Sequence, residues 1–309
     1  MLKKSLVVGL TFALAATAFV GCGSKDDKKD TTGDAATKPA AEAAPTKLVV
    51  GFIPSQNAES LSAKAKPMGE LLSKELGIPV EVSVTTNFNA LVEGMAAKKI
   101  DVGFLNPVNY VFAHDKKKAA DLLLQTSRQG SASYKSVFVK KKGDATIKEV
   151  KDIKGKKVAF VDGASAAGYL YPVVMIKNAQ LNPDTDITGT MAGGHDKALM
   201  ALYRGDVDVA TVFDSAIDQT IAKTTPDAKE KLEIFATSEP IPNDTVSIRP
   251  GFDDAFKKKV SDAFQKIMST PEGKKIGMDI YNFDGLQPAD DKNFDPVRKM
   301  IEATGAAPK

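Results

Sequence analysis

Residues 156–172 have the sequence KKVAFVDGASAAGYLYP, which places a strand, a turn and a helix in direct succession. The stretch opens with an apolar run that is typical of a buried strand and that ends at Asp162. A glycine-containing turn leads to Ser165, a favourable helix N-cap residue, and we expect a helix over 166–181. A strand followed at once by a helix is the repeating unit of α/β folds rich in parallel strands.

The same alternation extends along the chain on both sides of this unit. Helices are predicted over 57–76, where Gly77 provides the stop signal, and over 88–98, 106–114 and most of the tail after Asp253. Strands are predicted at 48–53, 80–86, 100–105, 121–126, 133–141, 206–213, 233–238 and 244–249.

Two segments echo each other, LVEGMAAKKIDVGFLN at 91–106 and LMALYRGDVDVATVFD at 199–214. Each is an amphipathic helix with basic residues near its end, then an Asp-Val turn into an apolar strand with a polar residue at its end. We interpret this as a weak internal duplication that predicts two similar lobes, with coincidence between two ordinary units as the alternative. Ligands of open α/β sheets lie beyond the carboxyl ends of the strands, so Asn106 and Asp214 are candidate binding residues.

The helix start after Ser165 is a candidate anion site, because the first N–H groups of a helix lack intrahelical partners. The backbone groups concerned belong to Ala166, Ala167 and Gly168. The alternative is an ordinary serine cap without a ligand.

Two further candidates come from other helix starts. Pro107 opens a helix after Asn106, with Tyr110 one turn further on. His195 follows two glycines at a helix start, where its ring can donate a hydrogen bond to an anion or can simply be solvated.

Enzymatic interpretations find little support. Ser165 and His195 are a possible nucleophile and base, but the sequence GASAAG differs from the G-x-S-x-G turn of hydrolases. Neither a phosphate-binding P-loop nor a zinc-ligand spacing is present, and we expect no catalytic residue, metal or cofactor.

The N-terminus predicts export and lipidation. Two lysines precede an apolar run over 6–20, and Gly21-Cys22 follows. This is typical of a lipoprotein signal over 1–21, cleaved before Cys22, whose acylation would anchor the protein on the extracytoplasmic face of the cell membrane. A signal peptide with an incidental cysteine is the alternative. Residues 22–46 are polar and Ala/Pro-rich, and we expect a disordered tether there.

Composition narrows the possible partners. The 309 residues are 43% hydrophobic, enough for a sizeable core, and include 42 basic and 39 acidic side chains, a formal charge of +3. Charges of both signs are mixed along the chain, which argues against nucleic acid as a partner. Apart from the signal, no apolar run reaches the length of a membrane span.

Five segments together resemble one known family: VGFIPSQN (50–57), NFNALVEGMAAKKIDVGFLNPVNYVFA (87–113), DIKGKKVAFVDGASAAGYLYP (152–172), GGHDKALMALYRGDVDVA (193–210) and SEPIPNDTVSIRP (238–250). In this order they are similar to the substrate-binding proteins of phosphate, phosphite and phosphonate ABC transporters. The resemblance covers nearly the whole chain after residue 47. It implies a two-lobed periplasmic-binding-protein fold of type II with a ligand cleft between the lobes. We expect one lobe over 47–138 with 250–309, and the other over 139–249.

The resemblance also implies a binding site. The family holds its phosphoryl group with an S-T-S-G helix start, two tyrosines and the histidine of GGHD. These positions fall here on Ser165, Ala166, Ala167, Gly168, Tyr110, Phe88 and His195. Three hydroxyl groups of the pattern are therefore absent, at Phe88, Ala166 and Ala167, which leaves the exact ligand open.

The sequence thus predicts a monomeric, lipid-anchored solute-binding protein that captures a small oxyanion for an ABC permease and its ATPase. A sensory protein that presents its ligand to a membrane receptor kinase is the alternative, and a secreted hydrolase using Ser165 and His195 is a weaker one.

Overall fold

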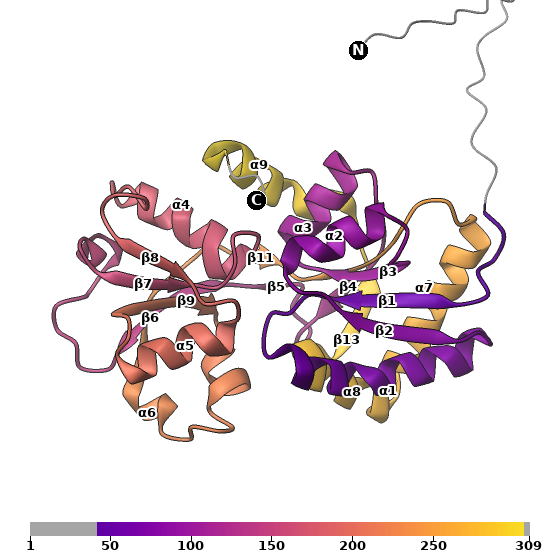
Figure 1. The fold of residues 1–309 in the computed structure, drawn as a ribbon, viewed down its shortest axis with the longest axis horizontal. Coiled ribbons are helices and arrows are strands. Elements are labelled where there is room, and N and C mark those ends of the chain that lie inside the picture. The colour runs from indigo at the N-terminus through magenta and orange to yellow at the C-terminus, as the bar shows by residue number, and fades with distance from the viewer. Residues whose placement is uncertain (1–41, 306–309) are drawn as a thin grey trace, which may run out of the picture. The chain divides into compact units, whose positions relative to one another are not determined.

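Two β-sheets, each covered by helices on both faces, organise residues 42–305, which are the residues that the computed structural model describes (Figure 1). We call each sheet with its helices a lobe. The inner strands of the sheets are short and mostly apolar, as expected where helices cover both faces of a sheet.

The first lobe contains the six-stranded sheet, with strand order β13-β4-β12-β3-β1-β2. Its strands are β1 (Leu48–Phe52), β2 (Val80–Val84), β3 (Val102–Leu105), β4 (Asp121–Ser127), β12 (Thr245–Ile248) and β13 (Gly285–Pro288). Its helical segments are α1 (Ala58–Leu76), α2 (Phe88–Ala96), α3 (Pro107–Val111), the π-helical turn η1 (Phe112–Lys116), α7 (Asp254–Met268) and α8 (Pro271–Tyr281).

The second lobe contains the five-stranded sheet, with strand order β10-β6-β9-β7-β8. Its strands are β6 (Ser136–Lys141), β7 (Lys157–Phe160), β8 (Thr188–Met191), β9 (Val209–Phe213) and β10 (Leu232–Thr237). Its helical segments are η2 (Val150–Ile153), η3 (Ala166–Leu170), α4 (Tyr171–Asn178), α5 (His195–Arg204), η4 (Ile217–Ile221) and α6 (Ala228–Lys231).

The two sheets share one arrangement. In the first, β1 pairs in parallel with β2 and β3, and β12 runs antiparallel beside β3. In the second, β7 pairs in parallel with β8 and β9, and β6 runs antiparallel beside β9. The two echoing segments of the sequence occupy equivalent places, because they form α2–β3 and α5–β9. The α/β two-lobed architecture predicted from the sequence is confirmed.

The chain passes between the sheets at a two-stranded ribbon, formed by β5 (Ser133–Tyr134) and β11 (Ile241–Pro242). The single strand predicted over 133–141 is therefore wrong, since it breaks at Lys135 and its two parts join different sheets. Strand β12 falls within the range 139–249 predicted for the second lobe, yet it pairs between β3 and β4 of the first sheet. Its four residues are all buried there, so β12 is part of the core of the first lobe.

Two predicted helices also differ from the structure. The helix expected over 106–114 is the short α3 followed by the π-helical turn η1. The helix expected over 166–181 begins as the π-helical turn η3 and continues without a break as α4, which ends at Asn178. By contrast, the first helix matches closely, with Asn57 as its cap and Gly77 in the left-handed conformation at its end.

The C-terminal helix α9 (Asp295–Thr304), preceded by the 3₁₀ turn η5 (Asp291–Phe294), contacts both lobes through α3 and α4 (Figure 1). Phe294 and Val297 are fully buried in an apolar cluster that also includes Tyr110 of the first lobe and Leu170 of the second. One apolar core thus continues across the two lobes.

The described chain begins at Glu42, which lies near the amino ends of β1 and β3 in the first sheet. The Glu42 N–H donates to Gly251 O at 2.8 Å, and its carboxylate pairs with Arg249 at 2.7 Å and with Lys98. Arg249 in turn pairs with the buried Asp101 at 2.9 Å.

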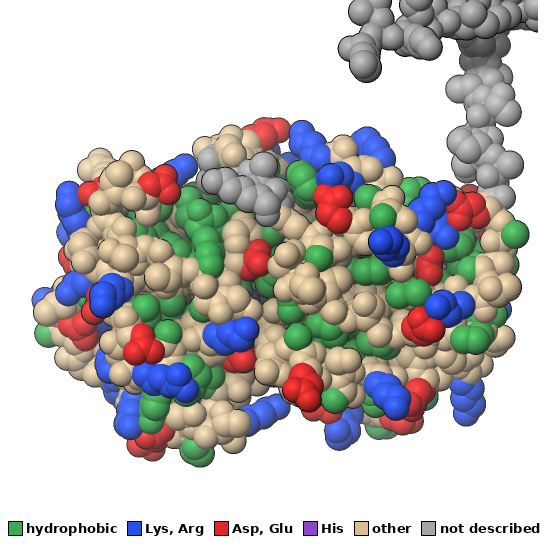
Figure 2. All heavy atoms as spheres, viewed as in Figure 1, with side chains coloured by type: hydrophobic (Ala, Val, Ile, Leu, Met, Phe, Trp, Pro, Cys, Tyr) green, Lys and Arg blue, Asp and Glu red, His purple; other side chains and the backbone are tan. Residues whose placement is uncertain are grey.

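Basic and acidic side chains are interspersed over the face seen in Figure 2. Within residues 42–305, no helix is both long and apolar enough to cross a bilayer. The predicted signal, Cys22 and most of the predicted tether lie outside the described residues.

Candidate ligand-binding cleft

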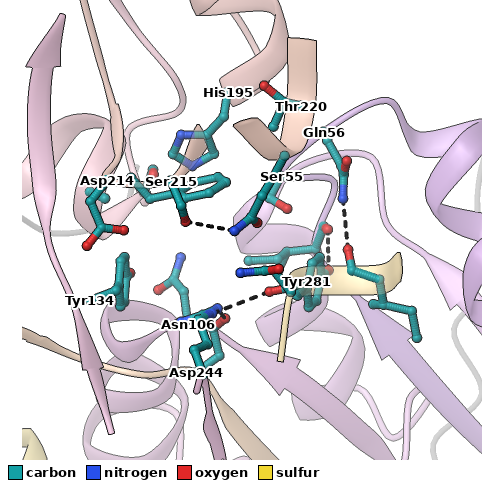
Figure 3. A pocket seen from close by; sticks show the side chains of 18 of the residues that line it. Ser55, Gln56, Asn106, Tyr134, His195, Asp214, Ser215, Thr220, Asp244 and Tyr281 are labelled. Carbon is teal, nitrogen blue, oxygen red and sulfur yellow. Dashed lines mark hydrogen bonds and ion pairs between the residues drawn. The ribbon is translucent and has the colours of Figure 1, made fainter. Parts of the chain in front are cut away.

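A cavity of about 370 Å³ lies between the lobes, at the carboxyl ends of the parallel strands of both sheets. First-lobe residues that line it include Ser55 after β1, Phe88 at the start of α2 and Asn106 after β3. Second-lobe residues include Ser165 after β7, His195 after β8 and Asp214 after β9. This is the position that open α/β sheets reserve for ligands, and Figure 3 shows side chains converging on it from both sides.

Helix N-termini surround this cavity. Phe88 is the first residue of α2 and His195 the first of α5, while Asn106 and Ser165 are the caps of α3 and η3. The amino end of a helix carries partial positive charge and unpaired N–H groups, so several such ends favour a negative ligand. The environment of the cavity is therefore suited to an anion.

The turn at Ser165 is built tightly. The Ser165 hydroxyl accepts the N–H of Gly168 at 3.0 Å, and Asp162 accepts the N–H of Ala164 at 2.8 Å. The N–H groups of Ala166 and Ala167 belong to the first turn of a helix and have no intrahelical acceptor, and both residues line the cavity.

Gly168 supports this turn without lining the cavity. A Cβ atom on it would lie 2.4 Å from the side chain of Val161, so only glycine allows the helix start to pack on β7 and its extension. Of the four residues predicted at this helix start, three reach the cavity and Gly168 does not.

His195, the first residue of α5, also lines the cavity. Its backbone N–H donates to Ser55 O of the first lobe at 3.0 Å, and its ring packs edge-on against Phe213 at 4.7 Å between centroids. Burial lowers the pKa of His195 from 6.5 to about 3, so the imidazole is neutral at physiological pH. Within the described residues, Nδ1 of this buried ring has no hydrogen-bond partner.

Asn106 of the first lobe also forms a contact with the second lobe. Its Oδ1 accepts the N–H of Asn109 as the cap of α3, and its Nδ2 donates to Ala164 O in the second lobe at 3.1 Å. With the bond between His195 and Ser55, two hydrogen bonds cross the cleft. The lobes are thus in contact around the cavity.

Apolar groups form much of the wall. Phe88, Ala166 and Ala167 stand where the resembled family carries hydroxyls, and Phe213 and Ile53 extend the apolar surface. A ligand oxygen against these side chains finds no side-chain hydrogen-bond donor, so only the backbone N–H groups of Ala166 and Ala167 can pair with it there.

Charged and aromatic groups close the floor of the cleft. Arg128 pairs with Asp244 at 2.7 Å, and its guanidinium lies 5.1 Å from the centre of the Tyr134 ring. Burial raises the pKa of the Tyr134 hydroxyl, which therefore stays protonated. Asp214 accepts the backbone N–H of Lys135 at 3.1 Å and lines the cavity, as predicted from the strand it follows.

Tyr110 lies outside the cavity, contrary to the expectation from the resemblance. Its hydroxyl donates to Asp291 at 2.7 Å, and its fully buried ring lies 4.6 Å from the ring of Phe294. The reason is the helical geometry of α3, which turns this side chain away from the strand ends and toward the C-terminal segment. Burial and Asp291 together raise the pKa of the Tyr110 hydroxyl.

Several lining residues were missed by sequence reasoning: Ser55, Gln56, Arg128, Tyr134, Ser215, Asp244 and Tyr281. The signal for Ser55 and Gln56 was present, because both follow the first strand. Arg128, Asp244 and Tyr281 come from antiparallel strands and the end of α8, and no local pattern marks them.

A two-lobed α/β chain with a ligand-sized cleft at the strand ends has the architecture of type II periplasmic binding proteins, and solved structures share it. One is a binding protein component of an ABC phosphonate transporter from Pseudomonas aeruginosa, with a TM-score of 0.76 and 23% identity over 84% of this chain and 86% of that one. Another is PhnD1 from Prochlorococcus marinus in complex with methylphosphonate, with a TM-score of 0.75 and 21% identity over 85% of this chain and 100% of that one.

Sequence comparison defines the family more closely. The phosphate-import protein PhnD from Mycolicibacterium smegmatis is 28% identical over 95% of this chain and 94% of its own length. Residues 50–294 match the family described as "ABC transporter, phosphonate, periplasmic substrate-binding protein". The chain belongs to this family, as its sequence predicted, and the sensory and hydrolase alternatives find no support in these comparisons.

Proposed function

We propose that this protein captures a small phosphorus oxyanion, a phosphonate, phosphite or phosphate, in the cleft between its lobes and delivers it to an ABC permease and its ATPase. The observation that carries this proposal is the ring of helix N-termini from both lobes around one cavity. The names of its relatives, which import phosphate or bind phosphonates, agree with it.

The oxyanion is proposed to sit at the helix start after Ser165. The Ser165 hydroxyl and the N–H groups of Ala166 and Ala167 are the proposed donors, and the neutral His195 ring offers one further N–H. The backbone donors compensate in part for the side-chain hydroxyls that Ala166 and Ala167 lack. Asn106 and Asp214 complete the polar surroundings.

Phe88 favours a particular kind of ligand. Inorganic phosphate carries oxygen at all four corners of the tetrahedron and would leave one oxygen against this ring without a hydrogen-bond partner, at a cost on the order of 1–3 kcal/mol. A ligand with an organic substituent places carbon there instead. We therefore infer that the native protein prefers an organic phosphonate to inorganic phosphate.

The lobe boundaries follow as part of the proposal. We propose that the lobes move as bodies about the ribbon of β5 and β11, so that β12 moves with the first lobe. The protein is proposed to bind its ligand without transforming it and to act as a monomer. Acylation at Cys22 is proposed to hold it on the extracytoplasmic face of the membrane, within reach of the permease.

Calorimetric titration of the purified protein with phosphate, phosphite and methylphosphonate tests the ligand class. We expect micromolar or tighter binding of at least one of them, with methylphosphonate bound more tightly than phosphate. Sulfate and acetate are the controls for unspecific anion binding and should bind at least a hundredfold more weakly. Failure of all three phosphorus compounds to bind would refute the proposal.

A further inference from the structure

Two lysines face the same cavity from opposite lobes. Lys64 projects from α1 of the first lobe, and Lys223 follows η4 of the second. Among residues 42–305, neither forms an ion pair with a carboxylate. Each therefore brings to the lining a positive charge that no direct ion pair neutralises.

Three carboxylates of the cavity lining are engaged in ion pairs with other cations. The ion pairs that occupy carboxylates of the cavity lining are Asp218–Lys229 at 2.6 Å, Asp279–Lys275 at 2.7 Å and Asp244–Arg128 at 2.7 Å. An anionic ligand group thus meets two unpaired ammonium groups here and no unpaired carboxylate from these three residues.

The two ammonium groups are close enough to influence each other. The pKa of Lys64 is lowered by its burial and by the charge of Lys223, while Asp279 and Asp196 act in the opposite direction. The second lobe thus brings Lys64 both a repulsive charge, Lys223, and an attractive one, Asp196, and an anion between the two lysines would offset the repulsion.

The two sides of the cavity carry different polar groups. Gln56, just before α1, and Thr220, in η4 shortly before Lys223, lie on one side of the cavity in Figure 3, while Asp214 and Tyr134 lie on the other. A ligand that extends from the Ser165 helix start thus meets the Asp214 carboxylate on one side and the neutral polar groups of Gln56 and Thr220 on the other.

The cavity has room for such an extension. Its volume of about 370 Å³ corresponds to roughly a dozen water molecules at about 30 Å³ each. A tetrahedral phosphorus group has only five heavy atoms at its centre and corners, so it leaves much of this space for a substituent.

We propose that Lys64 and Lys223 form a second anion subsite, which binds a carboxylate at the far end of a phosphonate ligand. This inference rests on the proposed function, because the phosphonate group itself is held at Ser165. It extends that function by naming the substrate class as carboxyalkyl phosphonates, such as 3-phosphonopropionate.

The test compares three ligands by calorimetric titration: methylphosphonate, 3-phosphonopropionate and 2-aminoethylphosphonate. The native protein is expected to bind 3-phosphonopropionate at least tenfold more tightly than the other two. In the double variant Lys64→Gln/Lys223→Gln this preference should disappear, while the affinity for methylphosphonate changes less than threefold.

A matched control removes the same total charge. Lys66 and Lys142 are exposed, one on each lobe, and neither lines the cavity. Lys66→Gln/Lys142→Gln should keep the full preference for 3-phosphonopropionate. An equal loss in both double variants would show general electrostatic attraction and would overturn the subsite.

Other outcomes are equally decisive. Tighter binding of 2-aminoethylphosphonate than of 3-phosphonopropionate by the native protein would overturn the inference, as would equal binding of methylphosphonate and 3-phosphonopropionate. In those cases the binding of a phosphonate still stands. Only the absence of binding to every phosphorus compound would remove the proposed function itself.

Discussion

Ser165 combines two roles that a matched pair of variants can separate. Its hydroxyl oxygen caps the helix by accepting the Gly168 N–H, and its proton is free to reach a ligand. Ser165→Ala should lower the free energy of unfolding by about 1 kcal/mol through loss of the cap. It should also weaken ligand binding by about 1–3 kcal/mol, roughly one to two decades in Kd.

The control is Thr270→Ala, because Thr270 caps α8 in the same way, accepting the Gly273 N–H at 3.0 Å, and does not line the cavity. It should reproduce the loss of stability in urea unfolding and leave the Kd unchanged in calorimetry. Equal Kd values for Ser165→Ala and the native protein would exclude the hydroxyl as a ligand donor.

His195 makes stability depend on pH in a defined window. Its pKa is about 3 in the folded protein and about 6.5 when unfolded, so between these values only the unfolded chain binds the proton. The stabilisation is fully present above pH 6.5 and is lost as the pH falls through that value toward 3. From pH 7.5 to pH 5 this residue should remove about 2 kcal/mol of stability.

Urea unfolding of the native protein and of His195→Gln at these two pH values measures the effect. The variant should lose less stability on acidification, by about 2 kcal/mol, because glutamine does not titrate. Identical pH dependence in the two proteins would mean that His195 is not held neutral in the fold.

At the scale of elements, the C-terminal helix is an ionic and apolar brace. Arg298 of α9 donates two hydrogen bonds to Asp115 of the first lobe, at 2.7 and 3.0 Å, and a third to Asp291 at 2.7 Å. Asp291 also accepts the Tyr110 hydroxyl, so the brace reaches the helix whose cap, Asn106, contacts the second lobe.

Arg298→Ala should lower the free energy of unfolding by about 1–3 kcal/mol, since it leaves Asp115 and Asp291 without their shared cation. It should also weaken ligand binding, because α9 packs on both α3 and α4 and holds the lobes together. Lys258→Ala is the control, since it breaks only the exposed pair with Asp262 and should change stability by less than about 0.5 kcal/mol. An unaltered Kd in Arg298→Ala would show that the brace does not act on the cleft.

The sequence was informative wherever a signal is local. A strand end, a helix start or both mark Asn106, Ser165, His195 and Asp214, and all four line the cavity. Lys135 illustrates the limit: the apolar and polar residues around it continue a strand pattern, while only the packing of two sheets decides that the chain breaks there. The same holds for β12, whose sheet is chosen by long-range pairing.

Tyr110 shows a second limit. A position within a family motif predicts which residue type is expected and not where its side chain points. The partner that holds Tyr110, Asp291, lies 181 residues away in sequence, so no local pattern announces the contact.

For the whole molecule, attachment to the membrane should depend on one atom. The sulfur of Cys22 is the only thiol of the chain and the proposed site of acylation. Cys22→Ser should move the protein from the membrane fraction to the soluble extracytoplasmic fraction, with ligand affinity unchanged. Mass spectrometry of the N-terminal peptide measures the lipid directly. A serine variant that still sediments with membranes would refute lipid anchoring at this site.

The cluster of Glu42, Arg249 and Asp101 also determines where a force on the N-terminal segment would act on the fold. A pulling force applied through the N-terminal segment would reach the molecule at Glu42 and act on the six-stranded sheet at the amino ends of β1 and β3, whereas the cavity lies at the carboxyl ends of these strands. The five-stranded sheet and the ribbon of β5 and β11 are separate from the sheet on which this force acts. In the proposed lipid-anchored form, the second lobe could therefore open and close the cleft while the first lobe keeps its distance from the anchor.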